Sequence, residues 1–293
     1  MNRLAHPFGG PTGLAGAIIV TFVVLVALLA PLIAPFDPLA ISLEHQLMPP
    51  DALHWFGTDQ SGRDILSRVM WGARPSLEIG IGSVVVSLLG GLSLGLIAGF
   101  YYGGWLEQGI MRTLDAIAAI PTLIWAIAVV GILGVGVSHL GPVGISNQTK
   151  VTILLGLLYI PGLARIVYVA TLVEARADYV AARRLQAVAD WKIMLGDVLP
   201  NTLSPIIVHA TLQIAVGVIL EAAISFVGLG IQPPAASWGN MLAQSRNFVF
   251  SGEWWLSVFP GLCISVTVIG FNLLGDGLRD RLDPRRQLTV TPT

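Results

Sequence analysis

The stretch LEIGIGSVVVSLLGGLSLGLIAGFYY, residues 77–102, has one charged residue, Glu78, near its start and then a long run without charge. Such a run is longer than the roughly 20 residues that a helix needs to cross a bilayer. The whole chain of 293 residues is 54% hydrophobic and only 11% charged. We therefore expect an integral membrane protein, for which water is not the main solvent.

Several segments share this apolar character. The segments long and apolar enough to span a membrane are residues 14–35, 77–102, 112–136, 151–173, 203–231 and 254–276. All six should be helices, because lipid offers no hydrogen-bond partner to an open backbone. The first run exceeds the roughly 7–15 apolar residues of a signal-peptide core, which favours an uncleaved anchor.

Glycines in the second span favour close packing of helices. Gly91, Gly95, Gly99 and Gly103 follow the spacing that lets two helix backbones approach each other. The partner helix can belong either to this chain or to a second subunit, because both arrangements give the same pattern.

Basic residues indicate the orientation, because they concentrate on the cytoplasmic side of membrane proteins. The residues on the predicted inside are Arg3, Arg112, Arg165, Arg176, Arg183, Arg184, Lys192, Arg279, Arg281, Arg285 and Arg286. The outside receives Arg63, Arg68, Arg74, Lys150 and Arg246. The excess favours both chain ends in the cytoplasm, together with residues 103–111 and 174–202.

The stretch DYVAARRLQAVADWKIMLGDVLPN, residues 178–201, concentrates charge on that cytoplasmic side. Read as a helix, its first part places Ala181, Ala182, Leu185, Val188 and Ala189 on one face. Asp190 can cap a second helix with an apolar stripe. This pattern predicts a helix-turn-helix docking element, and the alternative is a solvated loop.

The same segment resembles the EAA loop of binding-protein-dependent ABC importer permeases. The residues in matching places are Tyr179, Val180, Ala182, Arg184, Asp190, Leu199, Pro200 and Asn201. Three further stretches resemble the dipeptide, oligopeptide and nickel subfamily, in particular its C-type subunit: GTDQSGRDILSRVMWGARPSL at 57–77, EAAISFVGLGIQPPAASWGNML at 221–242 and NLLGDGLRDRLDPR at 272–285. The likeness covers about residues 15–286.

The resemblance implies an all-α integral membrane protein of the ABC type I importer permease fold, with six transmembrane helices and both termini inside. Residues 1–76 would form the anchor helix and an outer segment. Residues 77–286 would form the permease core, with the coupling loop at 174–202, and residues 287–293 a tail.

The loop would insert into a cytoplasmic ATPase and carry its motion into the membrane. The residues implied in this contact are Tyr179, Ala182, Arg183, Arg184, Leu185, Gln186, Ala187 and Asp190. The family's glutamate and glycine correspond here to Ala181 and Ala187, and Arg183 replaces a small residue. Without that glycine we expect a turn in the right-handed or bridge region at Ala187, and not a positive φ.

The resemblance also implies partners. They are a second homologous permease that forms a heterodimer with this chain, two ATPase subunits that bind ATP and Mg, and an extracytoplasmic solute-binding protein, in a bacterial inner membrane. Lys150 and Lys192 are the only lysines and neither fits the phosphate-binding G-x-x-x-x-G-K-[ST] motif. Cargo in the subfamily includes peptides, nickel complexes and glutathione, and the breadth of the family favours peptide.

Enzymatic chemistry and nucleic-acid binding find little support. The five histidines are scattered without H-x-x-x-H spacing, and Cys263 has no neighbour that suggests a metal site. No cofactor or metal is therefore expected on this chain. The net charge of −1, without a basic cluster interleaved with aromatics, disfavours nucleic acid. The rival functions are a stand-alone secondary carrier or channel and a membrane scaffold.

Charged residues in the spans have two interpretations each. Glu221 lies in an apolar run, where it either lines a translocation path or makes a buried hydrogen bond between helices. It is also the best candidate for the midplane coupling group of a secondary carrier. Asp115 and Arg165 should snorkel or pair with each other.

Each set of polar and aromatic residues in the outer segments either stabilises the chain at the membrane surface or contacts a partner. Asp59 and Arg63, with Asp64 and Arg68, either brace a short interfacial helix, ILSRVMWGA, or contact the solute-binding protein. Arg246 faces a partner or lipid headgroups. The tryptophans expected to anchor at the membrane interface are Trp238, Trp254 and Trp255.

Overall fold

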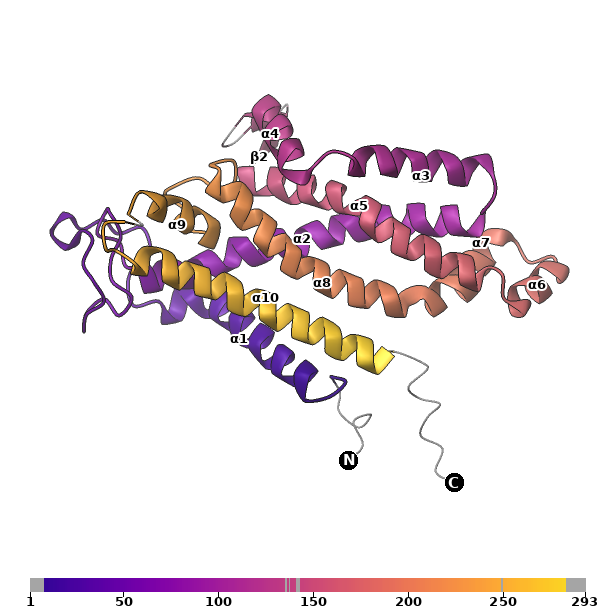
Figure 1. Ribbon diagram of the computed structural model, residues 1–293, viewed down its shortest axis with the longest axis horizontal. Coiled ribbons are helices and arrows are strands. Elements are labelled where there is room, and N and C mark those ends of the chain that lie inside the picture. Colours follow the sequence, from indigo (N-terminus) through magenta and orange to yellow (C-terminus); the bar gives the residue numbers. More distant parts are fainter. Residues whose placement is uncertain (1–7, 135, 137, 141–142, 249, 283–293) are drawn as a thin grey trace, which may run out of the picture.

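The computed structural model describes residues 8–134, 136, 138–140, 143–248 and 250–282, which form an elongated bundle of helices (Figure 1). The helices are α1 (Pro11–Ile33), α2 (Ile65–Phe100), α3 (Trp105–Ala118), α4 (Thr122–Leu133), α5 (Asn147–Glu174), α6 (Asp178–Leu185), α7 (Asp190–Ile193), α8 (Leu199–Phe226), α9 (Trp238–Ser245) and α10 (Trp255–Leu282). Short 3₁₀ turns cover Leu43–His45 and Arg246–Phe248, and a π-helical turn, Met194–Val198, joins α7 to α8.

One outer loop departs from the all-helical prediction. Strand β1 (Ser138–Leu140) pairs antiparallel with β2 (Val143–Ile145), so the chain between α4 and α5 forms a small hairpin. The rest of the described secondary structure is helical, as expected.

Five helical stretches in the described residues are long and apolar enough to cross a membrane: α1, α2, α5, the stretch Asp190–Phe226 that includes α8, and α10. The third predicted span, residues 112–136, is broken, because α3 and α4 meet the same criterion only as a pair, and that pair is bent by 83°. Pro121 stands at the break, immediately before α4. A proline there lacks the N–H that a continuous helix would need.

The second span begins earlier than predicted. The structure has no separate interfacial helix before residue 77, because α2 runs without interruption from Ile65. Asp64 begins the helix by accepting a hydrogen bond from the Ser67 backbone N–H at 2.8 Å. The amphipathic stretch is therefore the first part of the membrane helix itself.

The two ends of the bundle differ as the predicted orientation requires. The start of α1, the end of α10 and the α6–α7 loop lie at one end, and the segment between α1 and α2 lies at the other (Figure 1). An even number of crossings gives this arrangement. We refer to the end that carries α6 and α7 as the cytoplasmic end.

Helix α2 is central and packs most extensively against α5. A Cβ added at Gly95 would lie 2.4 Å from the Ala164 carbonyl oxygen, and one at Gly99 would lie 2.7 Å from the Thr171 side chain. The two backbones therefore touch where only glycine fits. This settles the alternative left open by the sequence, because the glycine face packs inside the subunit.

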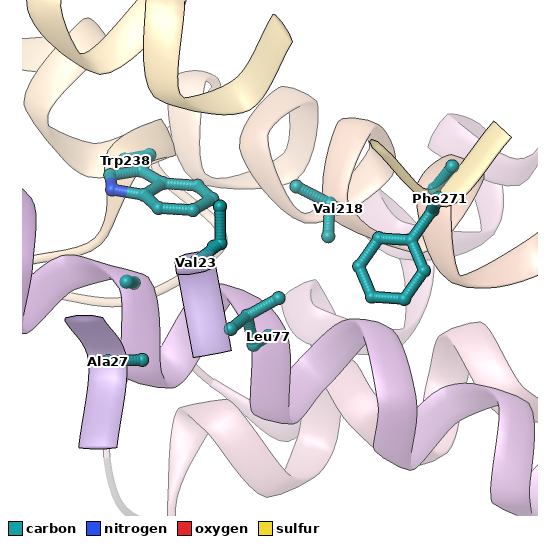
Figure 2. Close-up of a cluster of buried hydrophobic side chains, with 8 residues drawn as sticks. Val23, Ala27, Leu77, Val218, Trp238 and Phe271 are labelled. Atoms are coloured by element: carbon teal, nitrogen blue, oxygen red, sulfur yellow. The ribbon is translucent and has the colours of Figure 1, made fainter. Parts of the chain in front are cut away.

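A hydrophobic core joins α1, α2, α8, α9 and α10, and Figure 2 shows its side chains. Its labelled side chains are Val23 and Ala27 from α1, Leu77 from α2, Val218 from α8, Trp238 from α9 and Phe271 from α10. The prediction that Trp238 anchors at the membrane interface is wrong: it is 2% exposed, and its indole Nε1 donates to the Val69 carbonyl at 3.0 Å.

Trp255 is likewise buried, and its Nε1 donates to the Thr58 carbonyl at 3.1 Å. Both indoles satisfy their N–H inside the protein, which removes the reason for an interfacial position. Trp254 stays exposed, as an interface anchor requires.

Candidate functional site: the cytoplasmic loop

The loop between α5 and α8 is anchored by buried apolar side chains that pack against the membrane helices. Val180 of α6, Ile193 of α7 and Val198 of the π-helical turn are completely buried. They pack in one cluster with side chains of α2, α5 and α8, among them Phe100 and Val167. The predicted helix-turn-helix therefore packs against the membrane helices of its own chain and is not a freely solvated loop.

The opposite face of α6 is open. Leu185, the last residue of α6, is 90% exposed. Most neighbours on this surface are small or polar, and Ala181, Ala182, Arg184 and Gln186 are also exposed. An exposed leucine on an anchored helix offers an apolar contact that another protein can bury.

The turn after α6 has the geometry that the family's glycine would supply. Ala187 has φ 55°, so the expectation of a right-handed or bridge-region turn is wrong. The Ala187 N–H bonds the Arg184 carbonyl at 3.0 Å, and the Val188 N–H bonds the Arg183 carbonyl at 3.3 Å. These two bonds make a Schellman motif, which requires a left-handed residue at this place.

Ion pairs hold the two short helices together. Arg183 Nε lies 2.9 Å from Asp197 Oδ2, and Arg184 Nε lies 3.8 Å from Asp190 Oδ1. The Arg184 guanidinium also lies 4.9 Å from the centre of the Phe100 ring of α2. Part of each arginine is therefore directed at its own subunit, while both remain partly exposed.

Asp190 does not cap the second helix. The N-cap of α7 is Ala189, with no side-chain hydrogen bond, and Asp190 is the first helical residue. A carboxylate in the first turn still interacts favourably with the helix dipole. Its side chain turns toward Arg184, which links α7 to α6.

Tyr179 connects the loop to both flanking spans. Its hydroxyl donates to Glu174 Oε2 at 2.7 Å and accepts from Asn201 Nδ2 at 3.3 Å. Burial, and then the hydrogen bond to Glu174, raises the pKa of Tyr179, so the phenol stays protonated at neutral pH and can donate. Sequence reasoning missed two acidic residues: Glu174, which precedes the matched stretch, and Asp197, which lies inside it between Asp190 and Leu199.

The outer residues Asp59 and Arg63 brace the fold. Each is 6% exposed, and Arg63 Nε donates to Asp59 Oδ2 at 2.7 Å. Arg68 Nε lies 3.5 Å from the same oxygen, and Arg63 Nη2 reaches Gln244 at 3.1 Å. The structure favours the bracing role for this pair, because buried side chains offer little surface to a binding protein.

Arg246, the third outer residue singled out, is exposed at the end of α9. Its guanidinium lies 6.0 Å from the centre of the Phe226 ring. Asp115 of α3 and Arg165 of α5 form the expected pair.

Glu221 is completely buried, which favours a hydrogen bond between helices over a position in a translocation path. Ser76 of α2 donates to its Oε2 at 2.9 Å, and Ser225 of α8 donates to its Oε1 at 2.7 Å. Both carboxyl oxygens are therefore used inside the subunit, which leaves the translocation-path role without support. The described residues include no group of three or more His, Cys, Asp or Glu placed to hold a metal ion.

Comparisons with known proteins identify the family to which this bundle of membrane helices belongs. Residues 91–288 match the family described as "Binding-protein-dependent transport system inner membrane component". Residues 11–50 match the "N-terminal TM domain of oligopeptide transport permease C". The chain belongs to this family of binding-protein-dependent transport permeases.

Similar proteins include curated relatives and a solved structure. A di/tripeptide transport system permease, DppC, of Pseudomonas aeruginosa is 41% identical over 97% of this chain and 90% of its own length. A glutathione transport system permease, GsiD, of Pectobacterium atrosepticum is 42% identical over 80% of this chain and 74% of its own. A chain of the MetNI methionine ABC transporter, 17% identical, aligns with a TM-score of 0.59 over 73% of this chain and 96% of its own, which supports the fold.

Proposed function

We propose that this chain is the C-type permease subunit of an ATP-driven importer for di- or oligopeptides in a bacterial inner membrane. A second, related permease completes the translocation path, two cytoplasmic ATPase subunits bind and hydrolyse ATP with Mg, and an extracytoplasmic binding protein delivers the cargo. Support for peptide comes from relatives named as dipeptide permeases, one of them from Alkalihalophilus pseudofirmus at 39% identity over 93% of this chain.

The observation that carries the proposal is the contrast between the two faces of α6. Leu185 is exposed, while Val180 on the same helix is completely buried against the spans. A partner that moves α6 therefore moves a packed unit and not a slack loop. Closure of the ATPases would thus reach α2, α5 and α8, which gives a route to alternating access.

The exposed surface of helix α4 supports the proposal of a second permease subunit. Its side chains Ile124, Ile127 and Ile132 are exposed, and it protrudes from the bundle (Figure 1). The helix of 12 residues is too short to cross a bilayer alone, and its apolar surface needs a cover, which either lipid or another protein can give. A homologous subunit with complementary spans would provide one.

A stand-alone carrier is the weaker candidate. It needs a polar coupling group that can exchange protons or ions at the midplane. Glu221 was the best such residue in the sequence, and its carboxylate is enclosed by Ser76 and Ser225.

Substitution of Leu185 tests the docking role. We expect Leu185→Ser to weaken ATPase association by about tenfold or more, since burial of a leucine side chain contributes about 1.5–3 kcal/mol. Leu32→Ser is the matched control, because Leu32 is 82% exposed at the outer end of α1. The readouts are co-purification of ATPase subunits from mild detergent and peptide import into proteoliposomes.

Equal ATPase recovery and import in the two variants would contradict the proposal. Recovery of the wild-type chain alone, with ion-driven transport in liposomes, would favour the carrier instead.

A further inference from the structure

A groove of about 700 Å³ opens near the outer end of the molecule. Its floor is one face of α2, where Trp71, Arg74 and Glu78 follow at helical spacing. Residues 34–39, which follow α1, form one wall, and the other includes Gln148 at the start of α5 and Ala235. The volume lies in the range of small-molecule sites.

Arg74, the basic residue of the groove, is already engaged. Pro31 of α1 has no N–H for the Ala27 carbonyl, which a continuous helix would have satisfied. Arg74 Nε donates to that carbonyl at 2.6 Å, and Nη2 donates to the Leu28 carbonyl at 3.1 Å. The cation therefore completes the end of α1, and its two bonded nitrogens are not directed at a ligand.

Glu78, by contrast, is open. It is exposed although it belongs to a membrane helix, where a carboxylate is costly unless it faces water, protein or a partner. Gln148 Nε2 donates to its Oε2 at 2.5 Å, which orients the carboxylate. Among the interactions of the described residues, none is made by Oε1 of Glu78.

The rim strengthens the negative character of the groove. Asp37 is exposed in the wall after α1, and its Oδ1 accepts from the Leu39 N–H at 2.8 Å. Arg74 keeps its positive charge, and the two carboxylates outnumber it in a cavity that has apolar surface from Trp71 and Ile231. A small cationic donor with apolar side chains would complement this surface.

We infer that the groove receives the free α-ammonium group of a short peptide, with Glu78 as its ion-pair partner. A primary ammonium offers three donors and no acceptor, which matches the open Oε1. It is largely protonated at neutral pH, because α-amino groups have pKa values of about 7.7–8.0. The inference rests on the proposed peptide import and assigns a site for this cargo.

A cysteine in the wall of the groove tests the site without a need for ATP. Ala235→Cys is placed in a Cys263→Ala background, since Cys263 is the only native cysteine. The variant is assembled with its partner subunits in phosphatidylcholine vesicles and labelled with a membrane-impermeant maleimide. We expect dialanine to slow labelling and N-acetyl-dialanine to leave it unchanged.

The charge of Glu78 is then removed. We expect Glu78→Gln to raise the dialanine concentration for half-protection about tenfold, which corresponds to about 1.4 kcal/mol. Glu44→Gln is the control, because Glu44 is an exposed carboxylate of the outer segment that does not line the groove. It should leave protection unchanged.

Other outcomes separate this inference from the proposed function. Equal protection by both peptides would overturn ammonium recognition, and protection by phosphatidylethanolamine alone would make the groove a lipid site. No protection while the same assembled transporter imports dialanine would overturn the site and leave the proposed function standing. No import by the wild-type transporter would contradict the proposed function and this inference with it.

Discussion

Ala187 holds a left-handed backbone conformation that residues other than glycine adopt at a cost of roughly 1–2 kcal/mol. The turn keeps its Schellman hydrogen bonds to Arg183 and Arg184 all the same. The packed neighbours Val180 and Val198 fix the ends of the two short helices, so the chain between them has little choice of path. A local preference is thus overridden by packing.

Substitution at position 187 should expose this strain. We expect Ala187→Gly to slow hydrogen exchange of the Val188 amide by about fivefold, since roughly 1 kcal/mol of strain is relieved. Ala187→Val should speed the exchange and reduce import, because a β-branched residue fits positive φ poorly. Faster exchange in the glycine variant would show that the turn is not strained.

Glu221 is a second residue whose role the structure redefines. We expect Glu221→Ala to destabilise the protein by about 1–3 kcal/mol, because Ser76 and Ser225 lose a buried acceptor. Glu221→Gln should lie between alanine and wild type. Thermal unfolding can be followed with a thiol-reactive dye, since Cys263 is the single cysteine and partly buried.

The two roles of Glu221 give different results in that experiment. A path residue would change the KM for import and leave unfolding unaffected. A brace between α2 and α8 changes unfolding first, and the KM of the folded fraction stays as in wild type.

At the scale of elements, the contact between α2 and α5 depends on glycines, which have no side chain to separate the two helices. We expect Gly95→Ala to cost about 1–3 kcal/mol, because its Cβ would lie 2.4 Å from the Ala164 carbonyl oxygen. Gly162→Ala on α5 is the matched control, since nothing lies within 4 Å of a Cβ there. Dye-monitored unfolding of both variants measures the difference, and equal melting would refute close packing at Gly95.

The same elements show what sequence could predict. Apolar length predicted five spans well, because it depends only on local composition. It could not predict the 83° bend after α3, since hydropathy says nothing about the angle between two consecutive helices. Pro121 marks only where a break is possible. Trp238 was misplaced for a related reason: an indole suits an interface or a core equally, and only the surrounding helices decide.

At the scale of the whole molecule, the candidate site was predicted by its motif and refined by its packing. The helix-turn-helix of residues 178–201 could be predicted from the sequence because its charge and spacing differ from those of the spans around it; its docking role stays a prediction. The outer pair Asp59 and Arg63 was assigned two roles, and the structure favoured one because the pair is buried beneath Gln244 and beside Arg68. Burial depends on segments far apart in the chain, which a local motif does not contain.

The broken third span gives the last prediction. Ile127 and Ile132 of α4 are exposed in the single chain, and the proposed heterodimer should cover them. In a Cys263→Ala background, we expect Ile127→Cys and Ile132→Cys to react with maleimide in the isolated chain and to be protected about tenfold or more in the assembled transporter, because an apolar contact excludes water and reagent. Leu32→Cys, exposed on α1, is the control for changes in reagent access. If all three cysteines react equally in the assembled transporter, α4 is not a subunit contact.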